Sequence, residues 1–307
     1  MSNLHQILGD YLSMRRSLGF RLEREGSLLP DFIAFLEQAC SPTITSALAL
    51  AWATKPSPAE PKWWTRRLDM VRTFTRYVQT LDPRTEIPPY DLLPRFRHRP
   101  SPYIYADHEV VALMAAADRL GDSLRAETYR TLIGLLASTG MRVGEAIALD
   151  QADLDPEKQI LTVRYGKFGK SREVPLHPTA FQALTDYADS RNRRLRRSQG
   201  PTFFLSLAGT RLIYNNVHAT FFRMVDWADL VDRKPRRPRI HDLRHTFAVR
   251  TLIDWYRAGL DVESRLPVLS TYLGHVAPST TYWYLSAVPE LAGAAVQRLE
   301  RSLGGGS

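Results

Sequence analysis

The chain has 307 residues, enough for two domains that each bury a core of their own. Its 41 Lys and Arg residues outnumber 32 Asp and Glu residues, and the net charge of +9 favours a polyanionic partner, above all nucleic acid. Its sequence contains no apolar run of the roughly 20 residues that span a bilayer, which predicts a cytoplasmic protein without a membrane partner. The single cysteine, Cys40, excludes an intramolecular disulfide and a multi-cysteine zinc site, and we expect it to be a small buried residue.

The first part of the chain is typical of a helical bundle. Apolar residues recur at helical spacing from Leu4 to Leu12, from Leu28 to Leu36 and from Trp64 to Leu81, and "TSALALAWAT" adds a shorter helix. A run with six prolines follows, and it also carries Arg95, Arg97 and Arg99. We therefore expect a helical DNA-binding domain over residues 1–94 and a basic, proline-rich linker over 95–103.

The second part alternates helices with one hairpin. Helical patterns occupy "DHEVVALMAAADRL" and "AETYRTLIGLLASTG", and "QILTVRY" and "SREVPLH" are predicted to pair across the loop "GKFGK". Four further helices are expected over 177–197, 215–230, 241–258 and 266–273, the last ended by Gly274. The predicted fold is mostly α with a small antiparallel β-sheet over residues 104–303, and "GGGS" at 304–307 is expected to be an added linker.

Three residues of this second part suggest anion binding. His241 and Arg244 are three apart near the predicted start of a helix, a place that favours anions. Arg142 follows a glycine at the start of another helix and can present its planar guanidinium to a phosphate. Each feature alone is more often a solvated or structural residue.

Three more candidates complete the set: Lys167 in the hairpin loop, His275 directly after Gly274, and Tyr284 nine residues later. In chain order, the six resemble the signature of the tyrosine recombinase (phage integrase) family, which is Arg, Lys, His-x-x-Arg, Leu-Gly-His and a nucleophilic Tyr. The matching positions are Arg142, Lys167, His241, Arg244, His275 and Tyr284. The resemblance extends over about residues 104–300, although the segment between Arg244 and His275 is longer than in many relatives.

This resemblance implies a core-binding (SAM-like) domain before the linker and a catalytic integrase domain after it. It implies a site-specific recombinase that cleaves and rejoins DNA through a 3′-phosphotyrosyl intermediate, like those carried by bacterial mobile elements for integration, excision or transposition. The implied partners are double-stranded DNA and further copies of the chain on paired sites, up to a tetramer, with accessory or sister recombinases left open. Metal ions and other cofactors are not expected, and the location would be the bacterial cytoplasm, at the nucleoid.

The chemistry follows from the side chains. Two guanidinium groups, those of Arg142 and Arg244, would neutralise charge on the phosphate in the transition state. His241 and His275 would donate hydrogen bonds or handle the tyrosine proton, and Lys167 would protonate the departing 5′-oxygen. Two alternatives remain at this stage: a DNA-relaxing topoisomerase of the tyrosine type, and an inactive DNA-binding accessory protein on the same fold.

The neighbouring residues receive supporting roles. Tyr282 and Tyr284 lie two apart and would point about 200° away from each other on a helix, so one site can use only one. The family spacing selects Tyr284, and Tyr282 and Trp283 are expected to pack the segment onto the domain. His245 is expected to be structural support.

Asp242 and Glu145 are expected to be carboxylates that orient other groups near helix N-termini. The basic residues expected to contact DNA are Arg95, Arg97, Arg99, Arg193, Arg194, Arg236, Arg237 and Arg239. The segment after Pro289 is expected to form a short helix that docks on a neighbouring copy of the chain, with packing on its own domain as the alternative.

Overall fold

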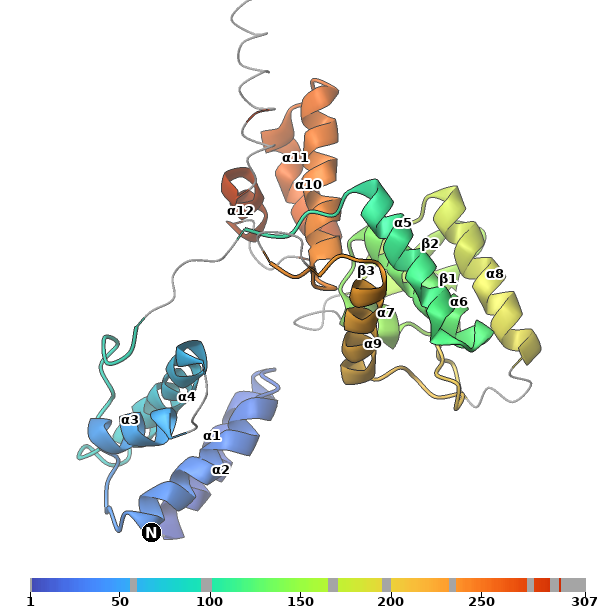
Figure 1. The fold of residues 1–307 in the computed structure, drawn as a ribbon. Helices are drawn as coiled ribbons and strands as arrows, with labels where there is room; N and C mark the ends of the chain where they lie inside the picture. Colours follow the sequence, from blue (N-terminus) through green and yellow to red (C-terminus); the bar gives the residue numbers. More distant parts are fainter. Residues whose placement is uncertain are drawn as a thin grey trace, which may run out of the picture. The chain divides into compact units, whose positions relative to one another are not determined.

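The computed structural model describes residues 2–55, 60–94, 101–164, 171–194, 200–231, 236–274, 279–287 and 293. The chain divides into two compact units, Met1–Pro100 and Ser101–Ser307. The fold is mostly helical with one small antiparallel sheet, which confirms the predicted fold class (Figure 1). Within the described ranges, no helix is long and apolar enough to cross a membrane.

The described part of the first unit contains four helices: α1 (Ser2–Ser17), α2 (Glu23–Gln38), α3 (Ser46–Thr54) and α4 (Pro61–Gln79). Their apolar faces meet in one core, in which Phe32 and Trp52 are fully buried. Arg67 of α4 lies over the Trp52 ring at 3.6 Å and donates a hydrogen bond of 3.0 Å to the Trp52 carbonyl. Leu81, expected on the apolar face, is 57% exposed because α4 has already ended.

Cys40 contradicts its sequence prediction. It is exposed, and it lies in the turn after α2 with a φ of 49°. The polypeptide reverses direction at this point, so the residue takes a left-handed backbone conformation at the surface instead of a place in the core.

The second unit surrounds the central helix α6. Its elements are α5 (Asp107–Ala116), η1 (Ala117–Leu120), α6 (Ser123–Thr139), α7 (Val143–Ala148), η2 (Gln151–Asp153), β1 (Leu154–Asp155), β2 (Ile160–Val163), β3 (Arg172–Pro175), α8 (Pro178–Arg194), α9 (Tyr214–Trp227), α10 (Asp242–Arg257), α11 (Val262–Leu273) and α12 (Ser279–Ala287). Helix α6 packs against α5, α8 and α10 (Figure 1).

The predicted hairpin is present and gains a third strand. Strands β2 and β3 pair with Val163 opposite Arg172 and Ile160 opposite Pro175, and the two-residue β1 pairs with the outer edge of β2. In β3 the side chain of Val174 is buried, so Arg172, two residues before it, lies on the same inward face.

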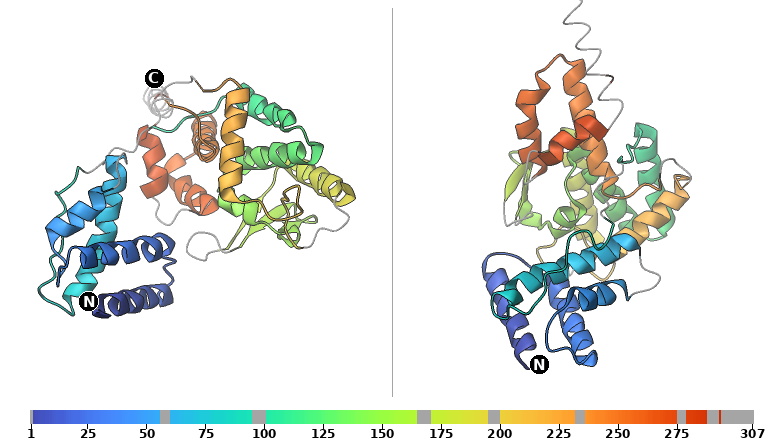
Figure 2. Two further views of the ribbon diagram at one scale, coloured as in Figure 1. Left: turned by 60° about the horizontal axis from the view of Figure 1, so that its bottom comes forward. Right: turned by 90° about the vertical axis from the view of Figure 1, so that its left-hand side faces the viewer.

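Besides its main core, which includes Leu132 and Leu136 of α6, the second unit has a smaller core between α10, α11 and α12, which gather together in both views of Figure 2. Helix α11 begins at Val262, four residues earlier than the predicted Leu266. The Asp261 side chain accepts hydrogen bonds from the first free N–H groups, so the helix begins there and continues through Pro267. Helix α11 ends at the predicted Gly274, whose φ is 66°.

Candidate active site

Arg142 is fixed at the junction between α6 and α7. Helix α6 ends at Gly140, and Arg142 is the N-cap of α7, where its backbone N–H donates to Glu145 Oε2 at 3.0 Å. Its guanidinium donates to Glu145 Oε1 at 2.7 Å and to the Gly274 carbonyl at 2.9 Å. The side chain is still 25% exposed, so a ligand can reach it.

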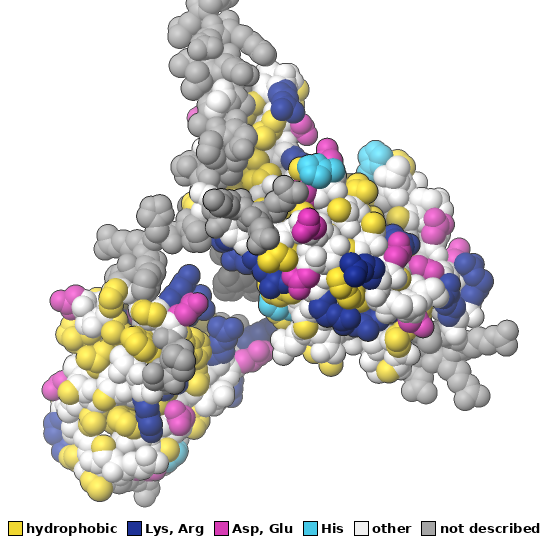
Figure 3. Space-filling model, viewed as in Figure 1, with side chains coloured by type: hydrophobic (Ala, Val, Ile, Leu, Met, Phe, Trp, Pro, Cys, Tyr) yellow, Lys and Arg dark blue, Asp and Glu magenta, His cyan; other side chains and the backbone are white. Residues whose placement is uncertain are grey.

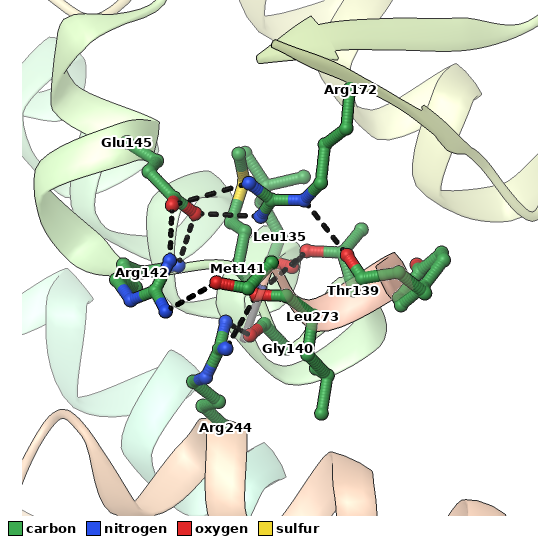
Figure 4. A network of polar contacts seen from close by, with 11 residues as sticks. Leu135, Thr139, Gly140, Met141, Arg142, Glu145, Arg172, Arg244 and Leu273 are labelled. Atoms are coloured by element: carbon green, nitrogen blue, oxygen red, sulfur yellow. Dashed lines mark hydrogen bonds and ion pairs between the residues drawn. The ribbon is translucent and has the colours of Figure 1, made fainter. Parts of the chain in front are cut away.

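Arg244 reaches the same place from the first turn of α10. It is 2% exposed, and its guanidinium donates to the carbonyls of Gly140, at 2.9 Å, and of Leu273. Burial and the nearby charge of Arg142 lower its pKa to about 10, which still leaves it charged at pH 7. Both predicted phosphate-binding arginines therefore lie beside the junction of α6 and α7, as Figure 4 shows.

Glu145 lies between Arg142 and a third arginine, Arg172 of β3, which the sequence analysis did not select (Figure 4). Arg172 donates to Glu145 Oε2 at 2.7 Å and to Oε1 at 3.2 Å. Burial would raise the pKa of Glu145, but hydrogen bonds from Arg172 and from the Arg142 backbone outweigh it and lower the pKa to about 2. The sequence could have pointed to Arg172 by its position, because a charged residue on the inward face of a strand needs a buried partner.

The end of α11 connects the three arginines. The carbonyl of Tyr272 accepts from Arg172 Nε at 2.7 Å, that of Leu273 from Arg244, and that of Gly274 from Arg142. The last carbonyls of a helix have no partners within it, and the helix dipole favours cations there. Three successive backbone oxygens, directly before His275, thus hold three guanidinium groups.

His241 is the residue before α10. Burial and the positive charge of Arg244 lower its pKa to about 4, and Asp242 opposes the effect. His241 is nevertheless exposed, so solvent moderates the lowering of its pKa. At pH 7 the His241 imidazole is neutral and can both donate and accept a hydrogen bond.

Tyr284 of α12 is 1% exposed, and its hydroxyl is 2.7 Å from His245 Nδ1. It is close enough to Arg244 for the two side chains to interact electrostatically. Tyr282 is 47% exposed, so the two tyrosines do point in different directions, but Tyr282 does not pack on the domain as expected. Trp283 does pack there, with its ring centroid 5.8 Å from that of His245.

Asp242 forms ion pairs with two arginines of the basic cluster that precedes α10. The fully buried Asp242 carboxylate accepts from Arg236 at 3.0 Å and from Arg239 at 3.1 Å. Arg237 binds Asp226 and lies 4.5 Å over the Phe222 ring.

In the other cluster, Arg194 binds Glu127 at 3.1 Å, and Arg193 is exposed. Dark blue Lys and Arg side chains gather on the face of the larger unit seen in Figure 3. Arg194, Arg236, Arg237 and Arg239 thus form ion pairs within the unit as well as carrying charge.

Several predicted residues lie outside the described ranges: Lys167, His275, Arg95, Arg97 and Arg99. The segment after Pro289, expected to form a terminal helix, lies outside them too, except Gly293. Among the residues that are described, no group of three or more His, Cys, Asp or Glu side chains is arranged to hold a metal ion.

The fold is that of the tyrosine recombinase class. Residues 104–290 match the phage integrase family. An integrase/recombinase named y4rB, from Sinorhizobium fredii strain NBRC 101917 / NGR234, is 44% identical over an alignment 310 positions long, which covers 98% of each chain. The chain belongs to the phage integrase family, and the predicted function as a site-specific tyrosine recombinase is confirmed.

Solved structures share the fold. The Tn1549 transposon integrase, solved in complex with a circular intermediate DNA, superposes with a TM-score of 0.66 at 19% identity, covering 96% of this chain and 98% of the other. A lambda integrase tetramer bound to a Holliday junction gives a TM-score of 0.60 at 18% identity, covering 90% of this chain and 78% of the other.

Proposed function

We propose that this recombinase cleaves and rejoins DNA with Tyr284 as nucleophile and Arg142 and Arg244 as the phosphate-binding pair. The observation that carries the proposal is the convergence of the two guanidinium groups, from the start of α7 and from α10, on the backbone at the end of α11. The Tyr284 hydroxyl lies 2.7 Å from His245, the residue after Arg244. Two fixed cations at one point suit a phosphate, whose negative charge grows in the transition state.

The proposed reaction exchanges the phosphodiester bond for a phosphotyrosyl ester, which keeps the bond energy available for rejoining. The Tyr284 oxygen bonds to phosphorus, the bond from phosphorus to the 5′-oxygen breaks, and a 3′-phosphotyrosyl ester forms. The tyrosine proton passes to a histidine, and Lys167 gives a proton to the 5′-oxygen. The neutral His241 is suited to hydrogen-bond the phosphate or accept that proton. Attack by a 5′-hydroxyl of another strand reverses these steps and completes the exchange.

Tyr284 has to move for this attack. Its hydroxyl is buried against His245, and a scissile phosphate cannot reach a side chain that is 1% exposed. In the proposed cycle, DNA binding brings the hydroxyl out of this contact. His245, expected to be structural support, thereby becomes the residue that holds the nucleophile at rest.

The proposed partner is double-stranded DNA, contacted by the basic linker and by the basic clusters of the second unit. Assembly on paired sites, up to a tetramer, is supported by the lambda integrase tetramer of the same fold, with the segment after Pro289 docking on a neighbouring copy. Residues 1–94 would act as a core-binding domain. The fold shared with a transposon integrase supports action on a mobile element, at the nucleoid in the cytoplasm.

A nicked suicide substrate tests the proposal, because loss of a short 5′ fragment prevents rejoining and traps the covalent adduct. Tyr284→Phe should bind DNA and form no adduct on a denaturing gel, whereas the matched control Tyr282→Phe should form it normally. Adduct formation should persist in excess EDTA. An adduct with Tyr284→Phe would overturn the assignment of the nucleophile.

A plasmid-relaxation assay tests the first alternative, and the adduct assay tests the second. A relaxing topoisomerase would remove supercoils from plasmids that lack paired sites, and an inactive accessory protein would form no adduct with the unaltered chain.

A further inference from the structure

Arg172 is held more tightly than a surface arginine of a hairpin would be. It is the first residue of β3, opposite Val163 of β2, and its side chain is 13% exposed. Both terminal nitrogens bind the two oxygens of Glu145, and Nε binds the Tyr272 carbonyl. Its guanidinium therefore joins three elements, β3, α7 and the end of α11.

The charges around Glu145 show what Arg172 supplies. Glu145 alone would neutralise Arg142, since the carboxylate and the guanidinium are 2.7 Å apart. With Arg172 the group has two guanidinium groups and one carboxylate, and Arg244 adds a third guanidinium. Three positive charges against one negative charge leave two positive charges, which match the charge of a phosphodiester in its transition state.

Space around Arg172 is closed on the side of α11. A Cβ atom at Gly274 would lie 2.9 Å from Arg172 Nη1 and 3.5 Å from Arg142 Nη1. The two guanidinium groups are thus packed against the same glycine, and movement of one changes the room available to the other.

We propose that Arg172 is a positioning residue, which shares the Glu145 carboxylate and the Tyr272 carbonyl so that Arg142 keeps both its orientation and its positive charge toward the scissile phosphate. The inference rests on the proposed function, because it assigns Arg142 to the phosphate. Arg172 acts through Glu145 and the backbone and does not itself touch DNA.

The first test compares Arg172→Gln with Arg164→Gln. Arg164 directly follows β2, at the same end of the hairpin as Arg172, and it binds Asp153. The control therefore removes an equal charge without changing the contacts of Glu145. Arg172→Gln should slow single-turnover cleavage by about 100-fold, the effect of misplacing a catalytic group by roughly 1 Å. DNA affinity should stay within about threefold of the unaltered chain, and Arg164→Gln should cleave normally.

A double-mutant cycle shows whether Arg172 acts through Glu145. In a Glu145→Gln background, Arg172→Gln should lower cleavage by less than about tenfold, because the carboxylate that the two residues share is gone. A full 100-fold loss in that background would overturn the proposed route. Thermal unfolding of each variant shows that folded proteins are being compared. The variant Arg172→Lys keeps the positive charge but lacks the planar guanidinium, so it should recover only part of the cleavage rate.

A substrate with a neutral methylphosphonate at the cleavage site distinguishes charge positioning from a general structural defect. Because less negative charge develops there, the loss caused by Arg172→Gln should shrink at least tenfold on this substrate, as it should for Arg142→Ala. Equal losses on both substrates would overturn the inference. If Tyr284→Phe still forms adducts, the proposed function fails. If Tyr284→Phe forms none but Arg172→Gln cleaves as fast as the unaltered chain, only the inference about Arg172 fails.

Discussion

The starts of α7 and α10 are built alike and are used differently. Each has a buried carboxylate bound by two arginines: Glu145 with Arg142 and Arg172, and Asp242 with Arg236 and Arg239. A carboxylate in the first turn of a helix is favoured by the helix dipole, which explains the shared design.

The two groups differ in what the carboxylate holds. Glu145 orients Arg142, a member of the candidate site, whereas Asp242 binds arginines of the basic cluster. Arg244, also in the first turn of α10, is bound by the carbonyls of Gly140 and Leu273 instead. A carbonyl orients a guanidinium without cancelling its charge, so Arg244 provides a full positive charge and Arg142 a shared one.

The largest effect is expected from Arg244→Ala. The activation free energy of cleavage should rise by about 3 kcal/mol or more, because a main charge-stabilising group is lost. The free energy of unfolding should fall by roughly 2 kcal/mol, because two buried carbonyls lose their donor. Single-turnover cleavage and denaturant unfolding measure the two. Arg142→Ala should slow cleavage as much as Arg244→Ala does but lower the free energy of unfolding less. Near-normal cleavage by either variant would remove that residue from the site.

Next in size is the exchange of the two carboxylates for amides. Glu145→Gln should reduce cleavage by about 100-fold, because Arg142 loses its orientation. Asp242→Asn should instead lower the free energy of unfolding by about 1–3 kcal/mol, the usual contribution of hydrogen bonds to a buried charge. Adduct assays and thermal unfolding of both proteins test the contrast. The comparison of the two helix starts breaks down if Asp242→Asn has the larger effect on cleavage.

A smaller effect is expected from pH, through His241. Its pKa in the folded protein, about 4, is below the ordinary value of 6.5. The unfolded chain therefore binds the proton more readily between these values, so stability is fully present above about pH 6.5 and declines as the pH falls toward 4. Histidine NMR titration, with His241→Gln to assign the signal, gives the pKa. A value at or above 6.5 in the DNA-free protein contradicts the expected electrostatics.

The smallest effect is expected at Arg237, which pairs with Asp226 where both side chains are more than 40% exposed. Arg237→Gln should change the free energy of unfolding by at most about 1 kcal/mol, as for other exposed ion pairs. If Arg237 contacts a phosphate, DNA affinity should fall and the salt dependence should weaken by about one counterion. Filter binding at several salt concentrations measures both, and an unchanged salt slope would leave Arg237 a purely structural residue.

Much of the fold could be predicted from the sequence, because apolar periodicity and the glycine and proline positions depend on local geometry. The four-helix first unit, the hairpin and the end of α11 at Gly274 were found in this way. The predicted start of α11 is four residues late, because the apolar spacing does not show that the Asp261 side chain caps the helix. Cys40 was misplaced because residue type alone does not reveal a left-handed turn.

By itself, the sequence determined the family and the order of the six residues that match its signature, and the family spacing led to the prediction of Tyr284 rather than Tyr282 as the nucleophile. Only the tertiary structure decided which polar atoms meet. Arg142 and the Gly274 carbonyl are 132 residues apart, and Arg172 reaches Tyr272 across 100 residues. Periodicity reports that a side chain faces inward, but its partner depends on how distant helices pack, and that packing brought Arg172 and three backbone carbonyls into the site.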